Sequence, residues 1–233
     1  MIHAVLFDLD STLLDVDVGN SFMEQYTRFL AEQLVPQDVE RGLAVLAGAM
    51  YSLLASEAHA ETNQGWLRQR LGDERKMPLP EIQGSFKRIV GKIAAGMGSR
   101  RDAATEAHLL IRQVHERGLK VVMATMPIYP RDLITERLRW AGVRPWISHV
   151  ACLEANRRSK LHRSYFVETS SAVGALPEQC LLVGWDVDQE LPALDAGMAV
   201  HLLEAPRGKP LITDRLRFGA LSDFWSVWAD AFG

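Results

Sequence analysis

Short apolar runs alternate with amphipathic stretches from about residue 100 onward. The runs at 119–125, 147–153, 179–186 and 198–203 have the length and apolar character of buried strands. The stretches between them repeat apolar residues three or four positions apart, which indicates helices, and two of them end at Gly118 and Gly142. With a first strand at 3–10, this alternation predicts an α/β fold, a doubly wound parallel sheet.

Residues 16–98 have a different pattern. Apolar positions recur with helical spacing at 21–34, 39–54 and 81–97, and residues 70–80 have the composition of a loop. We therefore predict an all-helical insertion at 16–98, between two parts of an α/β core at 1–15 and 99–233. The tail at 221–232 predicts a terminal helix whose aromatic residues pack against the core.

Composition supports an ordinary globular protein. The 233 residues are 48% hydrophobic and 24% charged, and Cys152 and Cys180 lie in apolar runs, where we expect them to be buried. The formal net charge of -3 favours neither nucleic acid nor an anionic membrane as a partner. The first residues lack the basic region of a signal peptide, and no apolar stretch is long enough to span a bilayer. We expect a soluble cytoplasmic protein.

Polar residues follow each of the predicted strands in the core. Asp8 and Asp10 end the first strand, Thr125 ends the second, Lys160 follows the third and Asp186 ends the fourth. In an open parallel sheet, ligands bind beyond the carboxyl ends of the strands, at the point where the strand order reverses. Side chains two residues apart on a strand point the same way, so both acids of the first strand are expected to face one pocket.

Several acids and one lysine at one site are typical of a divalent cation site. Asp8 and Asp186 offer the hard oxygen ligands that suit Mg²⁺. One aspartate would then attack phosphorus as a nucleophile, and a second acid would protonate the leaving oxygen and activate water. The Thr125 hydroxyl and the Lys160 ammonium would hold the oxygens of the transferring phosphoryl group.

The stretch "FDLDSTL", together with Thr125, Lys160 and "GWDVDQE", resembles the haloacid dehalogenase (HAD) superfamily of phosphohydrolases. The resemblance covers the whole chain in order, and it implies that 16–98 is a helical cap. It also implies that Asp8 is the nucleophile and Asp10 the general acid/base, with the backbone carbonyl of Asp10 as a metal ligand. Thr12 lies where a threonine orients the second acid.

The resemblance assigns the remaining roles position by position. Thr125 matches the phosphate-binding hydroxyl, with the backbone N–H of Met126 beside it, and Lys160 matches the lysine that steadies the nucleophile and the phosphoryl group. Asp186 matches the last metal ligand. The final motif departs from the family, because Trp185 stands between its glycine and its acid. Either Asp188 or Glu190 therefore completes this acidic pair.

These residues together predict a Mg²⁺-dependent phosphohydrolase that acts on a small phosphorylated metabolite through an aspartyl-phosphate intermediate. A phosphomutase or a dehalogenase-type member of the same superfamily is an alternative, although dehalogenases do not need the second acid that Asp10 supplies. A binding or regulatory scaffold with weakened catalysis is another alternative, because the last motif is altered.

Overall fold

The central element of the structure, a computed structural model, is one parallel sheet. The structure describes residues 1–14, 16–56, 60–74, 105–203 and 213–232. Six strands pair in the order β3-β2-β1-β4-β5-β6, and every pairing is parallel. The strands are β1 (Ala4–Phe7), β2 (Lys120–Met123), β3 (His149–Val150), β4 (Cys180–Gly184), β5 (Ala199–Leu202) and β6 (Leu216–Phe218).

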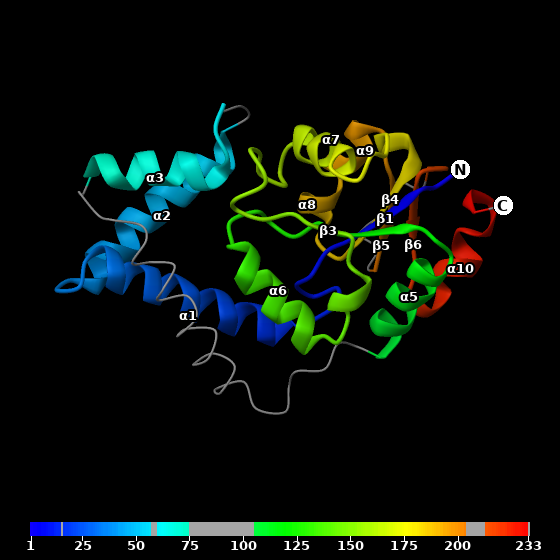
Figure 1. Cartoon of the computed structure of the whole chain (residues 1–233), viewed down its shortest axis with the longest axis horizontal. Coiled ribbons are helices and arrows are strands. Elements are labelled where there is room, and N and C mark those ends of the chain that lie inside the picture. The colour runs from blue at the N-terminus through cyan, green and yellow to red at the C-terminus, as the bar shows by residue number, and fades with distance from the viewer. Residues whose placement is uncertain (15, 57–59, 75–104, 204–212, 233) are drawn as a thin grey trace.

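Alternate residues of β1 point into two separate hydrophobic clusters, one on each face of the sheet. Val5 and Phe7 belong to the cluster that includes α5, α6 and α10, whereas Ala4 and Leu6 belong to the cluster that includes α7 and α9. Helices therefore cover both faces, as predicted (Figure 1). Their bounds are α5 (Thr105–Glu116), α6 (Arg131–Trp140), α7 (Arg163–Ser171), α8 (Val187–Glu190), α9 (Pro192–Ala196) and α10 (Phe224–Val227).

The strand order reverses at β1. The chain moves from β1 to β2 on one side, and β4 pairs with β1 on the other side, with Ala4 opposite both Lys120 and Cys180. The carboxyl ends of β1 and β4 therefore form the crevice where ligands bind in open α/β sheets. Short 3-10 turns complete the core at η1 (Arg144–Trp146), η2 (Pro177–Gln179), η3 (Leu221–Asp223) and η4 (Ala229–Ala231).

The described part of 16–98 contains helices and no strand. These helices are α1 (Val16–Leu34), α2 (Val39–Ala55) and α3 (Asn63–Glu74), and they lie beside the core on the left of Figure 1. The Asp38 side chain caps α2 by accepting a 3.0 Å hydrogen bond from the Arg41 backbone N–H. The predicted helix at 81–97 lies outside the described residues. No helix in the described ranges is long and apolar enough to cross a membrane.

Four local predictions were wrong or incomplete. Residues 70–74, predicted as loop, are the end of α3, a helix with no apolar stripe that begins where Thr62 accepts a 3.2 Å hydrogen bond from Gly65 N–H. The single helix predicted near 188–197 is two short helices, α8 and α9, divided at Pro192. The three-residue strand β6 was missed, and the tail forms short turns around α10 rather than one helix.

Candidate active site

Asp8 is the first residue after β1, and it lies at the centre of the site. Its backbone N–H donates a 2.9 Å hydrogen bond to the Val183 carbonyl, which continues the pairing of β1 with β4. This pairing holds the Asp8 side chain inside the protein, where the residue is only 8% exposed. The Thr12 hydroxyl lies 3.5 Å from Asp8 Oδ2, so it contacts the first acid rather than Asp10, which the sequence predicted it would orient.

Lys160 connects Asp8 to a second buried acid. Its ammonium donates 2.7 Å hydrogen bonds to Asp8 Oδ1 and to Glu190 Oε1, and both Lys160 and Glu190 are fully buried. Burial by itself lowers the pKa of Lys160, but the two carboxylates outweigh burial and raise that pKa above its ordinary value. Lys160 is therefore held as an ammonium between two elements that are distant in the sequence.

Two buried acids share this one ammonium, so ionisation of both would leave a net negative charge in the cluster. Burial raises the pKa of Asp8; Lys160 opposes this shift and Asp10 adds to it. Burial also raises the pKa of Glu190, against Lys160 and with Asp8. Both acids therefore lie in a place that favours an additional positive charge.

Asp188 and Glu190, the two candidates for the second acid of the last motif, lie in different environments. Asp188 is exposed, whereas Glu190 is buried against Lys160. Gly184, the last residue of β4, makes room for Glu190, because a Cβ at this position would overlap the Glu190 carboxyl group. Trp185 follows and is 39% exposed. The structure thus brings Glu190, and not Asp188, to the acids of β1.

The Asp186 carboxylate is bonded to the beginning of α8. Its Oδ1 accepts hydrogen bonds from the backbone N–H groups of Asp188 (3.0 Å) and Gln189 (3.3 Å), and its Oδ2 accepts one from Gln189 Nε2 (2.7 Å). The Asp186 carbonyl accepts a 3.0 Å hydrogen bond from the Glu190 backbone N–H, and Asp186 also contributes to the raised pKa of Glu190. Asp186 therefore lies at the edge of the cluster with its oxygens directed to the helix.

Asp10 has a different partner, which the sequence reading missed. The guanidinium of Arg137 bonds both carboxylate oxygens, Nη2 to Oδ1 and Nη1 to Oδ2 at 3.3 Å. The Arg137 side chain is fully buried, while that of Asp10 is 35% exposed. A signal was present in the sequence, because Arg137 shares its helix face with Leu133, Ile134 and Leu138, which are buried.

The Arg137 guanidinium is also part of a contact chain that reaches α1. It lies 5.9 Å from the ring centre of Tyr129, whose hydroxyl donates a 3.0 Å hydrogen bond to Met23 Sδ. The ring of Tyr129 also packs against Tyr26, with centroids 5.2 Å apart. Arg137, which binds Asp10, is therefore connected through Tyr129 to the helical segment.

Thr125 and Met126 follow β2 directly. Thr125 is 2% exposed, and its carbonyl accepts a 2.8 Å hydrogen bond from the Tyr165 hydroxyl of α7. Met126 is half-buried and packs against the hydrophobic core. The structure thus places all the predicted residues at the carboxyl edge of the sheet, although Asp8 and Asp10 have separate cationic partners.

The donor set fits a divalent cation in chemistry and charge. Carboxylate oxygens are ligands that Mg²⁺ prefers, and the buried carboxylates of Asp8 and Glu190 outnumber the Lys160 ammonium. Glu190 Oε2 is buried without a hydrogen-bond partner in the part of the chain that the structure describes. Within the same ranges, no group of three His, Cys, Asp or Glu side chains is arranged to hold an ion.

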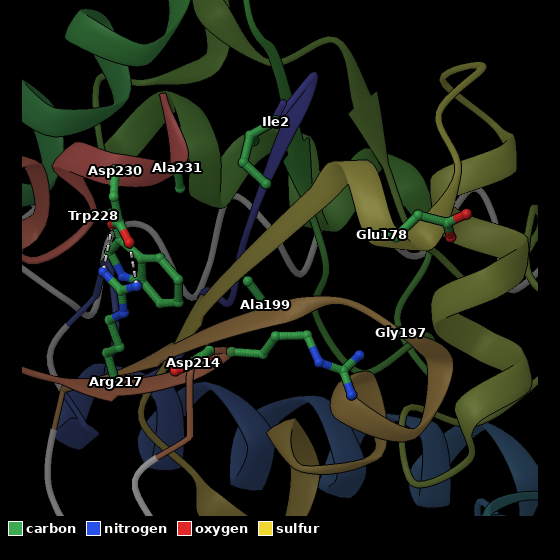
Figure 2. Close-up of a pocket in the computed structure, with 10 residues that line it drawn as sticks. Ile2, Glu178, Gly197, Ala199, Asp214, Arg217, Trp228, Asp230 and Ala231 are labelled. Carbon is green, nitrogen blue, oxygen red and sulfur yellow. Dashed lines mark hydrogen bonds and ion pairs between the residues drawn. The ribbon is translucent and has the colours of Figure 1, made fainter. Parts of the chain in front are cut away.

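A cavity of about 490 Å³ lies at the opposite edge of the sheet, before the strands begin. Figure 2 shows Ile2, Ala199 and Trp228 around it, with Arg217 paired to Asp230. The cavity is distinct from the acid cluster, because Ile2 and Ala199 precede or begin their strands whereas Asp8 and Asp186 follow theirs.

The family of haloacid dehalogenase-like hydrolases has a model that matches residues 2–196. The chain belongs to this family. A comparison with curated proteins found no match. The match to the HAD-like hydrolases confirms the predicted family, and the sheet confirms the predicted doubly wound fold.

Solved structures with the same HAD fold carry different activities. An L-2-haloacid dehalogenase from Xanthobacter autotrophicus is 17% identical, with all of both chains covered and a TM-score of 0.55. A HAD phosphatase from Thermococcus onnurineus is 13% identical, with 97% of both chains covered and a TM-score of 0.58. A HAD family hydrolase from Deinococcus radiodurans R1 with bound phosphate and sodium is 15% identical over 99% of this chain and 97% of that chain, with a TM-score of 0.54. At such identities the likeness shows the fold alone.

Proposed function

We propose that this HAD-like hydrolase is a Mg²⁺-dependent phosphohydrolase acting on a small phosphorylated metabolite. The observation that carries the proposal is the pair of acids at the end of β1, with Asp8 buried against Lys160 and Asp10 partly open to solvent two residues later. Transfer of a phosphoryl group to a carboxylate and then to water uses a nucleophile and a separate acid/base. Dehalogenation in this superfamily does not need the second acid, so Asp10 favours phosphate chemistry.

The first step is attack by Asp8 on phosphorus. Lys160 holds Oδ1 at 2.7 Å, whereas the contact from Thr12 to Oδ2 is long, so we assign the attack to Oδ2. A bond forms from Oδ2 to phosphorus, and the bond from phosphorus to the ester oxygen breaks. The ester oxygen keeps the electron pair and takes the proton of the Asp10 carboxyl group, which yields an alcohol and an aspartyl phosphate.

The second step returns the enzyme to its starting state. The Asp10 carboxylate takes a proton from water, and the water oxygen attacks phosphorus. The bond from phosphorus to Asp8 breaks, which releases inorganic phosphate, the Asp8 carboxylate and a protonated Asp10. Arg137 fixes the orientation of the Asp10 carboxylate through its two hydrogen bonds, so we assign it the role of a positioning residue.

The remaining predicted residues would bind and screen the phosphoryl group. The Thr125 hydroxyl, the Met126 N–H and the Lys160 ammonium would donate to its oxygens. Mg²⁺, held by Asp8, the Asp10 carbonyl and Asp186, would neutralise charge on the phosphoryl oxygens. We assign α1, α2 and α3 to a cap that excludes water from this site.

Turnover of p-nitrophenyl phosphate and of a panel of small phosphate esters, with Mg²⁺ or with a chelator, tests the proposal. We expect hydrolysis that needs Mg²⁺ and is lost in Asp8→Asn, with Asp188→Asn as an exposed matched control. L-2-chloropropionate is assayed in parallel. Chloride release without phosphate release would establish the dehalogenase alternative, and a folded protein that releases neither ion would favour the binding scaffold.

A further inference from the structure

Asn63, the first residue of α3, is fully buried at the junction between the helical segment and the core. Its backbone N–H donates a 2.7 Å hydrogen bond to the Asn156 carbonyl, and the next residue, Gln64, donates one of 2.9 Å to the Leu153 carbonyl. The start of α3 is therefore attached to the loop that leads from β3 to Lys160.

The side chain of Asn63 joins this loop to a second one. Its amide nitrogen donates one hydrogen bond to the Pro127 carbonyl at 3.1 Å and one to the Arg158 carbonyl at 3.2 Å. Pro127 directly follows Thr125 and Met126, and Arg158 lies two residues before Lys160. A single amide group therefore links the two core loops that carry the proposed phosphate-binding groups.

The helix does not need this side chain in order to begin. Thr62 precedes it and caps α3 by accepting the Gly65 N–H. The two N–H groups of the Asn63 amide are thus used between the loops rather than within the helix. Asparagine suits the task, since aspartate has no donor and glutamine is one methylene longer.

The far side of the Lys160 loop is fixed by the core itself. The Arg157 backbone N–H bonds both carboxylate oxygens of Glu168 in α7, at 3.0 and 3.2 Å. The Asn156 side chain bonds Thr169 and Glu168, at 3.3 Å in both cases. Asn63 therefore holds the Lys160 loop from its other side, where the helical segment contacts the core.

We propose that Asn63 is a positioning residue, which holds the Thr125–Met126 loop and the Lys160 loop at the separation needed to bind one phosphoryl group. The inference rests on the proposed function, because that function makes these loops the phosphate site. It assigns to the helical segment a role beyond covering the site. A group placed about 1 Å away from its productive position can lose a hundredfold in rate.

Asn63→Asp is the main test variant. It keeps the size of the side chain, and a carboxylate at the first turn favours the helix, but it has no donor and faces two carbonyl oxygens. Asn63→Ala removes the amide without adding charge, in case the aspartate prevents folding. Gln64→Ala is the control, because it keeps the backbone bond to Leu153 in the same turn.

Two measurements below the melting temperature test whether Asn63 positions the two loops. Hydrogen exchange of peptides covering 125–130 and 153–162 reports on the loops without any activity. The dissociation constant of inorganic phosphate with Mg²⁺ present reports on the site. We expect both Asn63 variants to exchange faster in both loops and to bind phosphate about tenfold or more weakly; Gln64→Ala should match the wild type in both measurements.

Each other outcome has a defined meaning. Unchanged exchange in both loops overturns the inference, and so does faster exchange with wild-type phosphate affinity. If the wild type neither binds phosphate nor hydrolyses any ester, the proposed function and the phosphate-positioning role fail together. A wild type that is active beside unaltered Asn63 variants would leave the proposed function standing and remove the inference alone.

Discussion

The two edges of the central sheet are built from the same strands but differ in how deeply their charged side chains are buried. At the carboxyl edge, Lys160 and Glu190 are fully buried and Asp8 is nearly so. At the amino edge, Arg217 forms a salt bridge with Asp230 beside an open cavity, and the Asp230 side chain is 67% exposed (Figure 2). The first arrangement removes charges from water, whereas the second leaves them in it.

A stable fold does not require buried charges, so the buried charges at the carboxyl edge need another explanation, which is the function of the site. Removing charges from water costs several kcal/mol per ion unless partners compensate for it, and one ammonium does not balance two carboxylates. An exposed pair has no such cost and contributes little to stability. Perturbed acids in a crevice are therefore a mark of function, while the amino edge has the arrangement expected of a folded surface.

The largest effect is expected for Asp8→Asn, which should reduce turnover by about 10⁴-fold or more because it removes the nucleophile. The same change should not lower the melting temperature of the metal-free protein, since Lys160 keeps Glu190 as a partner and one of two buried acids is removed. Steady-state kinetics and calorimetry check the two parts. Substantial residual activity, or a marked loss of stability, would contradict the interpretation that the buried charges at the carboxyl edge serve catalysis rather than stability.

Asp10→Asn should reduce turnover by about a hundredfold to a thousandfold, because it removes the proton donor and acceptor. Mg²⁺ affinity should stay close to that of the wild type, since the contact we assign to Asp10 is through its backbone carbonyl. Titration calorimetry with Mg²⁺ measures this directly. A variant that no longer binds the ion would show that the Asp10 side chain is itself a ligand.

Glu190→Gln should change how stability depends on pH in the metal-free protein. Burial raises the pKa of Glu190 from 4.5 to about 8, with Lys160 opposing the shift and Asp8 adding to it. Between these values the folded state keeps a proton that the unfolded state has lost, so the free energy of unfolding falls as pH rises from about 4.5 to 8.

The amide introduced by Glu190→Gln cannot ionise, so the variant should lose this decline and exceed the wild type by about 4 kcal/mol at pH 8. Urea unfolding across that range measures the difference. Glu178→Gln, which changes an exposed acid at the amino edge, is the control and should follow the wild-type curve. Parallel curves for the wild type and both variants would mean that Glu190 is not perturbed.

Asp186→Asn should weaken Mg²⁺ binding about tenfold, whereas Asp188→Asn should change it less than about twofold. Asparagine still caps α8, so the first change tests the ligand rather than the helix. Asp188 is exposed, so its substitution serves as the matched control. The reverse order of effects would mean that the shortened motif places its ligand two residues later.

The sequence was sufficient for the features that depend on neighbouring residues. Apolar runs predicted β1, β2, β3, β4 and β5, and the polar residues that follow them predicted which side chains meet at the carboxyl edge. The strand β6 has three residues and contains Arg217, so no apolar run marks it. The helix α3 has no apolar stripe, and its start is defined by contacts with the core.

The sequence did not predict which side chains pair when they are far apart in the chain. Arg137 lies 127 residues from Asp10, and Asn63 lies 95 residues from Arg158. The position of Arg137 on a buried helix face was a signal that something must compensate its charge, but not which acid does so. Asn63 gave no signal, because a polar residue at a helix start is ordinary.

Arg217→Met should have the smallest effect, and it completes the comparison of the two edges. The guanidinium bonds Asp230 at 2.7 and 2.8 Å, donates a hydrogen bond to the Val227 carbonyl and lies 4.3 Å from the ring centre of Trp228, which methionine still covers. Because the ion pair is exposed, the melting temperature should fall by only about 2–4 °C or less. Turnover and Mg²⁺ affinity should be unchanged, and a clear loss of either would show that the amino edge contributes to the site across the sheet.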